Sequence, residues 1–196
     1  MDQAQRKYRL PGRGTSSNRP GRFEPLTVSA VADGWAGDDD PLPVLRTQVS
    51  VEIPRSVISY NQSPDLPFDR SINPYRGCEH GCVYCFARPS HAYLGLSPGL
   101  DFETRLIARP EAPEVLKREL AAKKYQVAPI AIGTNTDPYQ PIEKDWRITR
   151  QVLKVLVETR HPTFITTKSD FYNSNFFSIF ISKKGLCSCV YCCNIR

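Results

Sequence analysis

Three cysteines lie within one eight-residue stretch of this chain, at Cys78, Cys82 and Cys85, in the spacing C-x3-C-x2-C. Three thiolates on one short loop can ligate three irons of a cubane 4Fe–4S cluster and leave the fourth iron open to a small molecule. Such a loop must bend closely around a bulky inorganic core, and glycine bends there at no steric cost. Because Gly77 and Gly81 directly precede the first two cysteines, the sequence predicts a tight metal-binding loop.

The same ligands suit two other roles. His80 lies between the first two cysteines, so a zinc site with three cysteines and one histidine is an alternative on ligand type. Zinc sites more often show two spaced ligand pairs, which favours the cluster. A disulfide is disfavoured, because the chain begins without the apolar segment of a secretion signal and disulfides belong to oxidising compartments.

Length and composition indicate a globular protein with one core. The chain has 196 residues, of which 40% are hydrophobic and 23% are charged, as in ordinary soluble domains. No stretch approaches the roughly 18 consecutive apolar residues that a membrane-spanning helix needs. The net charge of +6 permits attraction to nucleic acid or other anions without demonstrating it. Seven cysteines without a secretion signal favour metal or redox chemistry in a reducing compartment, so we expect a cytoplasmic protein.

The composition divides the chain into three unequal parts. Residues 1–65 are rich in Pro, Gly, Ser and Arg, so we expect a mostly flexible N-terminal extension with a short strand at 49–53. Residues 66–169 alternate between strand and helix patterns and form the predicted core. Residues 170–196 lack a clean helical stripe and end in four closely spaced cysteines, so we expect an atypical tail outside the core fold.

The central part shows the pattern of an α/β protein. A first strand at 71–75 leads into the cysteine loop, although Pro74 limits its pairing. Apolar stripes predict helices over 113–125 and 145–160. Short apolar runs at 129–133 and 164–167 are typical of strands buried in a parallel sheet. The last helix and its two flanking strands form one predicted βαβ unit.

Two further motifs follow the predicted strands. Residues 133–141 read GTNTDPYQP, and residues 165–169 read ITTKS. Together with the cysteine loop, in which Tyr84 directly precedes the last cysteine, they resemble the radical S-adenosylmethionine superfamily. Within it, the chain is most similar to the branch that includes spore photoproduct lyase. All three motifs lie at the carboxyl ends of strands, which is where parallel α/β barrels place their chemistry.

The resemblance implies an α/β fold, a partial (β/α) barrel with about three strand–helix units. It implies that Cys78, Cys82 and Cys85 ligate a 4Fe–4S cluster whose open iron binds S-adenosylmethionine. A one-electron donor of flavodoxin or ferredoxin type would reduce the cluster. Reductive cleavage would then yield a 5′-deoxyadenosyl radical that abstracts hydrogen from a substrate, as in a lyase. The protein orients these cofactors and excludes competing reactions.

Five residues outside the ligand set receive cofactor roles from the same resemblance. Tyr84 and Phe86 would pack against the adenine, with ordinary core packing as the alternative. Thr136 matches a hydroxyl that contacts the methionine part, and Lys168 matches a lysine that pairs with its carboxylate. Asp137 would orient the ligand amine or, alternatively, cap the turn before a proline. No catalytic residue is assigned, and the substrate is not readable.

The chain also departs from the family pattern. It lacks the Gly-Gly-Glu that many members place after the second strand, and it supplies about half of the usual six strand–helix units. We therefore expect a truncation after about residue 169, and an inactive fragment is one interpretation. For Cys187, Cys189, Cys192 and Cys193, accidental composition is favoured over an auxiliary metal site.

Two functions from other classes stay open. One is a non-enzymatic iron–sulfur or zinc-binding protein, which needs only the cysteine loop. The other is a nucleic-acid-binding module, suggested by the basic N-terminal stretch and the resemblance to a DNA-repair lyase.

Overall fold

The computed structural model describes residues 14–15, 17–23, 46–169 and 189–192. The chain divides into two compact units. One contains residues 1–49 and 77–106, which include the cysteine loop, and is called the loop unit below. The other contains residues 50–76 and 107–196 and is called the sheet unit. The chain therefore crosses from one unit to the other three times.

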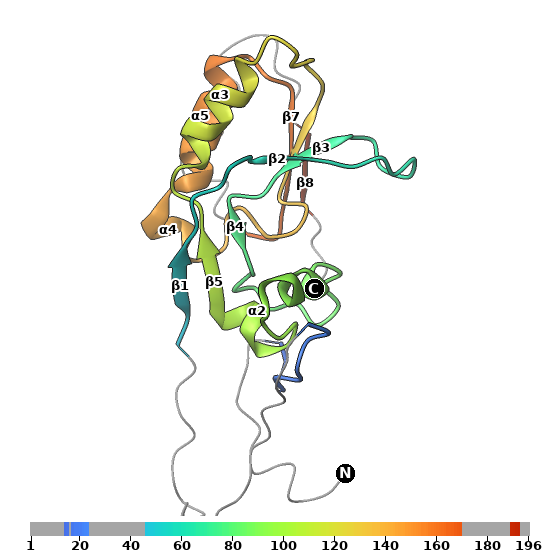
Figure 1. The fold of residues 1–196 in the computed structure, drawn as a ribbon, viewed down its shortest axis with the longest axis vertical. Coiled ribbons are helices and arrows are strands. Elements are labelled where there is room, and N and C mark those ends of the chain that lie inside the picture. The colour runs from blue at the N-terminus through green and yellow to red at the C-terminus, as the bar shows by residue number, and fades with distance from the viewer. Residues whose placement is uncertain (1–13, 16, 24–45, 170–188, 193–196) are drawn as a thin grey trace, which may run out of the picture. The chain divides into compact units, whose positions relative to one another are not determined.

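A five-stranded sheet forms the centre of the sheet unit (Figure 1). Its strands are β2 (Ile58–Tyr60), β3 (Arg70–Ile72), β6 (Ile130–Ile132), β7 (Thr163–Thr167) and β8 (Cys189–Cys192), in that spatial order. The edge strand β2 is antiparallel to β3, whereas β3, β6, β7 and β8 are parallel to one another. The sheet is therefore mixed, and the predicted parallel pairing is present among β3, β6 and β7.

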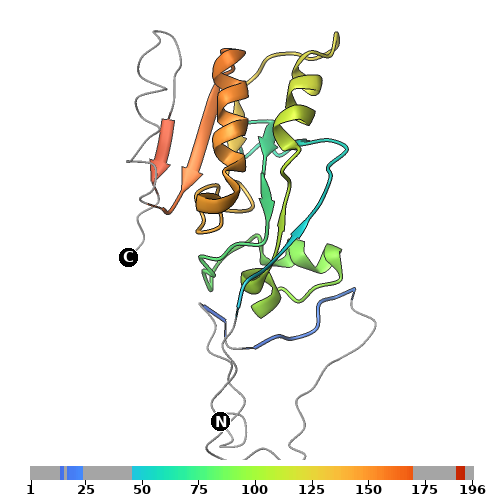
Figure 2. The ribbon, with the colours of Figure 1, turned by 90° about the vertical axis from the view of Figure 1, so that its left-hand side faces the viewer.

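Two helices lie side by side in the same unit, α3 (Ala112–Leu120) and α5 (Ile148–Glu158) (Figure 2). Each presents an apolar stripe of helical period, as the sequence predicts. All three residues of β6 are buried, as expected for a strand covered on both faces. The core of the unit includes the following fully buried side chains: Ile72, Leu116, Ile130, Ile132, Ile148, Leu153 and Leu156.

The predicted βαβ unit is confirmed, since β6 and β7 are parallel and α5 lies between them in sequence. The predicted single helix over 145–160 is wrong at its beginning. A separate turn, α4 (Glu143–Trp146), precedes it, and Arg147 breaks the helix with a left-handed φ of 53°. The Glu143 carboxylate accepts hydrogen bonds from the first N–H groups of α5, at Thr149 and Arg150, both at 3.0 Å. This cap starts a new helix at that position.

The predicted strand over 71–75 is two strands, because Pro74 cannot donate to a ladder. β3 ends at Ile72, and β4 (Tyr75–Arg76) belongs to a second sheet of three strands, in the order β1-β5-β4. β4 is antiparallel to β5 (Arg105–Ala108). The third strand, β1 (Gln48–Val51), lies where the sequence predicts a short strand.

The described residues of the loop unit form little regular structure. Besides the cysteine loop it contains a 3₁₀ helix, η1 (Arg88–Leu94), and one short helix, α2 (Leu100–Thr104). Residues from the N-terminal part hydrogen-bond to α2. The N–H of Leu100 donates to the Ser17 carbonyl at 3.3 Å, and the Asn18 amide nitrogen donates to the Asp101 carboxylate at 3.0 Å. This stretch of the N-terminal part is thus held against the loop unit.

The chain is therefore a mixed α/β protein with two small sheets among the residues that the structure describes. These residues form no closed barrel, and the partial radical S-adenosylmethionine barrel stays a prediction. Residues 189–192 of the predicted tail pair with β7, while the other tail residues, with Cys187 and Cys193, lie outside the described ranges. None of the described helices combines the length and the apolar character needed to cross a membrane.

Candidate metal-binding loop and the carboxyl edge of the sheet

The cysteine loop begins at a glycine that no other residue could replace without strain. Gly77 has a φ of 75°, and a Cβ atom there would lie 2.7 Å from Leu106 Cδ2 and 2.9 Å from the Phe102 carbonyl oxygen. The same carbonyl accepts a hydrogen bond from the Cys78 N–H at 2.9 Å. Because these contacts leave no room for a side chain, they fix the point at which the loop starts.

A repeated turn then organises the loop. Each of the three cysteine carbonyls accepts a hydrogen bond from the N–H three residues further along the chain. The donors are Gly81 to Cys78 at 3.2 Å, Cys85 to Cys82 at 3.2 Å, and Arg88 to Cys85 at 3.3 Å. Gly81 has a left-handed φ of 60°, which glycine adopts freely. The backbone at all three cysteines is thus ordered by turns, not by a helix or a strand.

The three cysteines are thiols and form no disulfide. Cys78 is buried with 7% of its surface exposed, and Cys82 and Cys85 are half-buried. Among the described residues, no three Cys, His, Asp or Glu side chains are already gathered as metal ligands. In ligand type and number the loop fits three corners of a cubane cluster. The thiols would have to draw together as the metal binds, which is how metal binding becomes coupled to folding.

Two aromatic rings lie exposed beside the third cysteine. Tyr84 is 64% exposed and Phe86 is 78% exposed, and the neighbouring Val83 is also exposed. Neither ring belongs to a core, so the core-packing alternative for these two residues is wrong. Their faces are accessible for packing against a planar ligand.

The second predicted group of residues lies at the carboxyl edge of the parallel sheet, in the sheet unit. Gly133 follows β6 with a φ of 89°, and a Cβ atom there would lie 2.2 Å from the Thr166 carbonyl oxygen. The loop after β6 therefore packs directly on the end of β7. Asn73, which follows β3, accepts a hydrogen bond from the Asn135 N–H at 2.9 Å. These contacts join the ends of three neighbouring parallel strands.

Asp137 is the centre of this edge. The residue is 8% exposed, and its carboxylate accepts hydrogen bonds from Tyr139 N at 2.8 Å, Thr167 Oγ1 at 2.8 Å and Lys168 N at 2.6 Å. The bond to Tyr139 closes the turn around Pro138, as the capping alternative for Asp137 predicts. The other two bonds hold the end of β7, so Asp137 also fixes the backbone from which the Lys168 side chain extends.

The remaining two predicted residues differ in exposure. Thr136 is 4% exposed, and its hydroxyl donates to the Tyr75 carbonyl at 3.1 Å. Lys168 is exposed. The structure thus gathers Thr136, Asp137 and the Lys168 backbone at one edge of the sheet unit, and it gathers the cysteines with Tyr84 and Phe86 in the loop unit.

Sequence reasoning missed a half-buried acid in the sheet unit, Glu143. Glu143 hydrogen-bonds the hydroxyl of Tyr75, a side chain with no exposed surface. Burial raises the pKa of the Glu143 carboxyl above its ordinary value, although the hydrogen bonds from Tyr75 and the helix N–H groups oppose this. Burial and the nearby carboxylate both raise the pKa of Tyr75. Each polar side chain satisfies the other, so the pair is a structural element of the core.

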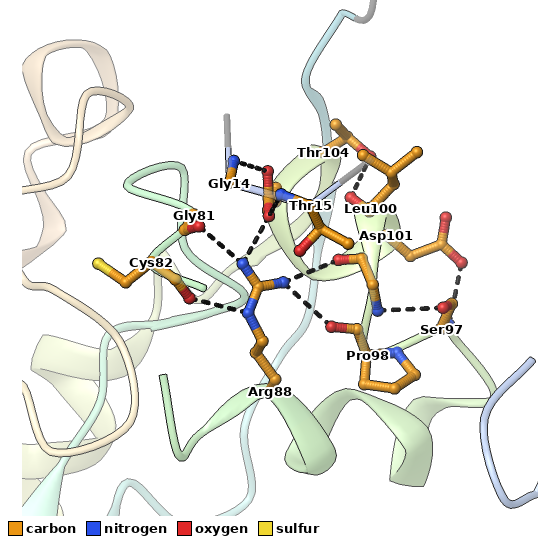
Figure 3. Close-up of polar contacts among 12 residues, drawn as sticks. Gly14, Thr15, Gly81, Cys82, Arg88, Ser97, Pro98, Leu100, Asp101 and Thr104 are labelled. Atoms are coloured by element: carbon orange, nitrogen blue, oxygen red, sulfur yellow. Dashed lines mark hydrogen bonds and ion pairs between the residues drawn. The ribbon is translucent and has the colours of Figure 1, made fainter. Parts of the chain in front are cut away.

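Sequence reasoning also missed Arg88, whose guanidinium group makes five hydrogen bonds in the loop unit (Figure 3). Its Nε donates to the Cys82 carbonyl at 2.9 Å, and its Nη2 donates to the Gly81 carbonyl at 2.7 Å. The same Nη2 pairs with the Glu103 carboxylate at 2.5 Å. Arg88 is 8% exposed and Glu103 is fully buried. The third nitrogen donates to two carbonyls, those of Pro98 and Gly99, each at 3.1 Å.

Glu103 is satisfied from the other side by the N-terminal stretch. Its two carboxylate oxygens accept the N–H groups of Gly14 at 3.1 Å and of Thr15 at 3.0 Å. Nothing in the local sequence identifies this pair, because Arg88 and Glu103 are 15 positions apart and Gly14 is 89 positions from Glu103. The signal exists only once the chain has folded.

Comparison with known proteins gives relatives without an assigned function. An uncharacterized protein of Mycobacterium tuberculosis is 42% identical over 103 residues, which are 53% of this chain and 30% of that protein. A protein of Mycobacterium bovis matches to the same extent. An uncharacterized protein of Methanocaldococcus jannaschii is 31% identical over 99 residues, 50% of this chain and 35% of that protein. The chain thus covers about a third of these relatives. No family model and no solved structure matches it.

Proposed function

We propose that this chain is a radical S-adenosylmethionine protein, or a part of one, that holds a 4Fe–4S cluster through Cys78, Cys82 and Cys85. One observation carries the proposal: three thiols lie on a single loop whose backbone is ordered by glycines and by repeated turns at the cysteine carbonyls. Three ligands on one loop leave one iron of a cubane without a protein ligand, unlike the four-cysteine sites of electron carriers.

The loop residues would hold the cluster and shape its surroundings. The cluster, when bound, supplies the electron for reductive cleavage of S-adenosylmethionine at its open iron. Cys78, which is buried, would anchor the inner side, and the two half-buried thiols would close on the metal from the outer side. Tyr84 and Phe86 would offer their exposed faces to the adenine, because aromatic faces stack on planar rings.

By the same resemblance, residues at the carboxyl edge of the sheet unit receive cofactor roles. Lys168, exposed at the end of β7, would pair with the cofactor carboxylate. Thr136 and Asp137 already use their side-chain oxygens in hydrogen bonds within the edge. In this proposal Asp137 therefore acts as a positioning residue that fixes the backbone of Lys168. A one-electron donor of flavodoxin or ferredoxin type would reduce the cluster, in the cytoplasm, and the substrate stays open.

Anaerobic reconstitution with iron and sulfide tests the proposal. We expect the chain to take up about four iron and four sulfide ions and to form 5′-deoxyadenosine from S-adenosylmethionine in the presence of a strong reductant. The Cys82→Ala variant removes one of three ligands, so it should retain no cluster. Val83→Ala is the matched control, since it trims an exposed neighbour in the same loop without removing a ligand.

Three outcomes would contradict the proposal. Zinc bound in place of iron would favour the zinc alternative, with His80 as the fourth ligand. A cluster that binds but never cleaves S-adenosylmethionine would leave a non-enzymatic iron–sulfur protein. Equal iron content in Cys82→Ala and Val83→Ala would exclude Cys82 as a ligand.

A further inference from the structure

Arg88 does more than neutralise a buried acid. Its guanidinium group makes five hydrogen bonds in the loop unit, and two of them reach the carbonyls of Gly81 and Cys82 inside the cysteine loop. Figure 3 shows the Cys82 carbonyl turned toward the guanidinium group and the Cys82 sulfur on the side facing away from it. The guanidinium group therefore binds the backbone of the loop on one side, and the Cys82 sulfur lies on the opposite side.

The planarity of the peptide bond gives this grip a consequence for the metal. In a trans peptide the C=O and the following N–H point in opposite directions. Because the Cys82 carbonyl points at Arg88, the N–H of Val83 points to the opposite side, the side on which the Cys82 sulfur lies. Backbone N–H groups directed at cluster sulfurs set the reduction potential of iron–sulfur sites, and N–H dipoles favour the reduced, more negative state.

We propose that Arg88 is a positioning residue for the cluster loop, holding the Cys82–Val83 peptide so that its N–H faces the thiolate side. The inference rests on the proposed function, since it concerns the loop that would hold the cluster. Replacing residues of this kind, which orient metal ligands without touching the metal, typically lowers metal affinity about 10- to 100-fold.

The positive charge of Arg88 is balanced by the carboxylate of Glu103 beside it. Glu103 pairs with it at 2.5 Å and receives the N–H groups of Gly14 and Thr15. Gly14 itself packs so closely on the loop that a Cβ atom there would lie 1.8 Å from the Gly81 carbonyl oxygen. The proposed role of Arg88 therefore lies in its geometry, because the pair as a whole adds no net charge beside the loop.

The Arg88→Lys substitution distinguishes the effect of the guanidinium geometry from the effect of the positive charge. Arginine spreads five N–H donors over a rigid plane, whereas lysine concentrates its donors at one point. A lysine at position 88 keeps the positive charge for Glu103, but it cannot reach the Gly81, Cys82, Pro98 and Gly99 carbonyls together. If Arg88 acts by positioning, Arg88→Lys should behave like the uncharged Arg88→Gln. If it acts by charge alone, Arg88→Lys should behave like the wild type.

The experiment compares the full chain with Arg88→Lys, Arg88→Gln and the control Arg105→Gln, which removes an exposed arginine of the same unit. After anaerobic reconstitution, the midpoint potential and the rate of iron loss to a chelator are measured. We expect both Arg88 variants to shift the potential to more negative values and to lose iron about 10- to 100-fold faster. The control should match the wild type.

A second measurement needs no metal. The Cys85 N–H donates to the Cys82 carbonyl that Arg88 also holds. Amide hydrogen exchange at Cys85 in the metal-free chain should therefore be about 10-fold faster in Arg88→Lys, as expected when a hydrogen bond to a charged group is lost. Exchange at Ile132 and Ile165 in the sheet unit should not change.

The outcomes separate the two proposals. A wild type that forms the cluster, with an Arg88→Lys variant that matches it in potential, iron loss and Cys85 exchange, overturns the role of Arg88 and leaves the proposed function standing. A wild type that takes up no cluster overturns both. Loss of exchange protection throughout both units in Arg88→Lys would make Arg88 a residue of the whole fold, which also overturns the assignment.

Discussion

The two units of this protein are stabilised in different ways. In the sheet unit, strands and helices bury a continuous set of aliphatic side chains, including Ile132 and Leu153. In the described part of the loop unit, Cys78, Ala87 and Phe102 form a small buried cluster at the cysteine loop, and the charged side chain of Arg88 makes five hydrogen bonds. Burial of apolar surface is non-directional, whereas hydrogen bonds to a guanidinium require each acceptor in its place. The loop unit therefore gains defined geometry where the sheet unit gains stability.

This difference suits a metal site. In the proposed function, a cluster bound by the three cysteines would add free energy of folding to the loop unit. In the sheet unit, the helices and strands bury their aliphatic side chains against one another, which stabilises that unit. Substitutions in the two units should accordingly have effects that remain in the unit where they are made.

The largest effect is expected from Glu103→Ala in the loop unit. Removing one partner of a buried ion pair leaves the other charge without compensation, which typically costs about 3–5 kcal/mol. Hydrogen exchange of the metal-free chain should show lost protection in α2 and in the cysteine loop, with β6 and β7 unchanged. Glu114→Ala is the control, because Glu114 forms an exposed pair with Lys117. Equal exchange in the two variants would mean that the Arg88–Glu103 pair does not stabilise the loop unit.

A comparable or slightly smaller effect is expected from Leu153→Ala in the sheet unit. Leu153 has no exposed surface, and replacing a buried leucine by alanine costs about 2–5 kcal/mol through lost burial and a residual cavity. Chemical denaturation followed by exchange at β6 and β7 measures this loss. Its neighbour Lys154 is exposed, so Lys154→Ala should leave the sheet unit unchanged. A Leu153→Ala variant that weakens both units equally would show that the two units unfold together.

The smallest expected effect is on the loss of folding stability at acidic pH. Burial lowers the pKa of His91 in the loop unit, despite its contact with the Arg105 carbonyl and the nearby Asp101, and it lowers the pKa of His161 in the sheet unit, near Arg70. A depressed pKa means that the folded state binds a proton less readily than the unfolded state does. Each histidine therefore contributes stability above its unfolded pKa of about 6.5, and this stability is lost as the pH falls through the lowered folded value.

His91→Gln and His161→Gln distinguish these two contributions. The wild type should lose protection from hydrogen exchange as the pH falls below about 6.5. His91→Gln should reduce this loss in the loop unit alone, and His161→Gln should reduce it in the sheet unit alone. Glutamine keeps a donor for the carbonyl that each ring contacts, Arg105 O for His91 and Pro162 O for His161. Exchange rates of the metal-free chain, corrected for the intrinsic effect of pH, provide the measurement. An unchanged acid dependence in both variants would assign the loss to other groups.

Prediction from the sequence succeeded where a pattern is local and repeated. The apolar runs before Gly133 and Lys168 became β6 and β7, and the stripes around Leu116 and Leu153 became α3 and α5. It failed where one residue redirects the chain. Arg147 breaks a helix that the stripe alone would continue, because the Glu143 carboxylate caps a new first turn.

For the candidate site the sequence identified the ligands but not their support. The spacing of Cys78, Cys82 and Cys85 predicts them as candidate metal ligands without a structure, because all three lie in a single short segment. The dual role of Asp137 was only half predictable: the turn at Tyr139 is two residues away, but its bonds to Thr167 and Lys168 cross 30 residues or more.

The sequence by itself determined the positions of the cysteines, the glycines that turn the loop and the segments that become strands and helices, because short-range sterics and periodic burial govern all of these. Only the tertiary structure decided that the Arg88 guanidinium donates hydrogen bonds to the Gly81 and Cys82 carbonyls. It also decided that the Glu103 carboxylate binds both Arg88 and the Gly14 N–H. These contacts join residues distant in sequence, and a buried charge acquires its partners only when the folded chain removes it from water.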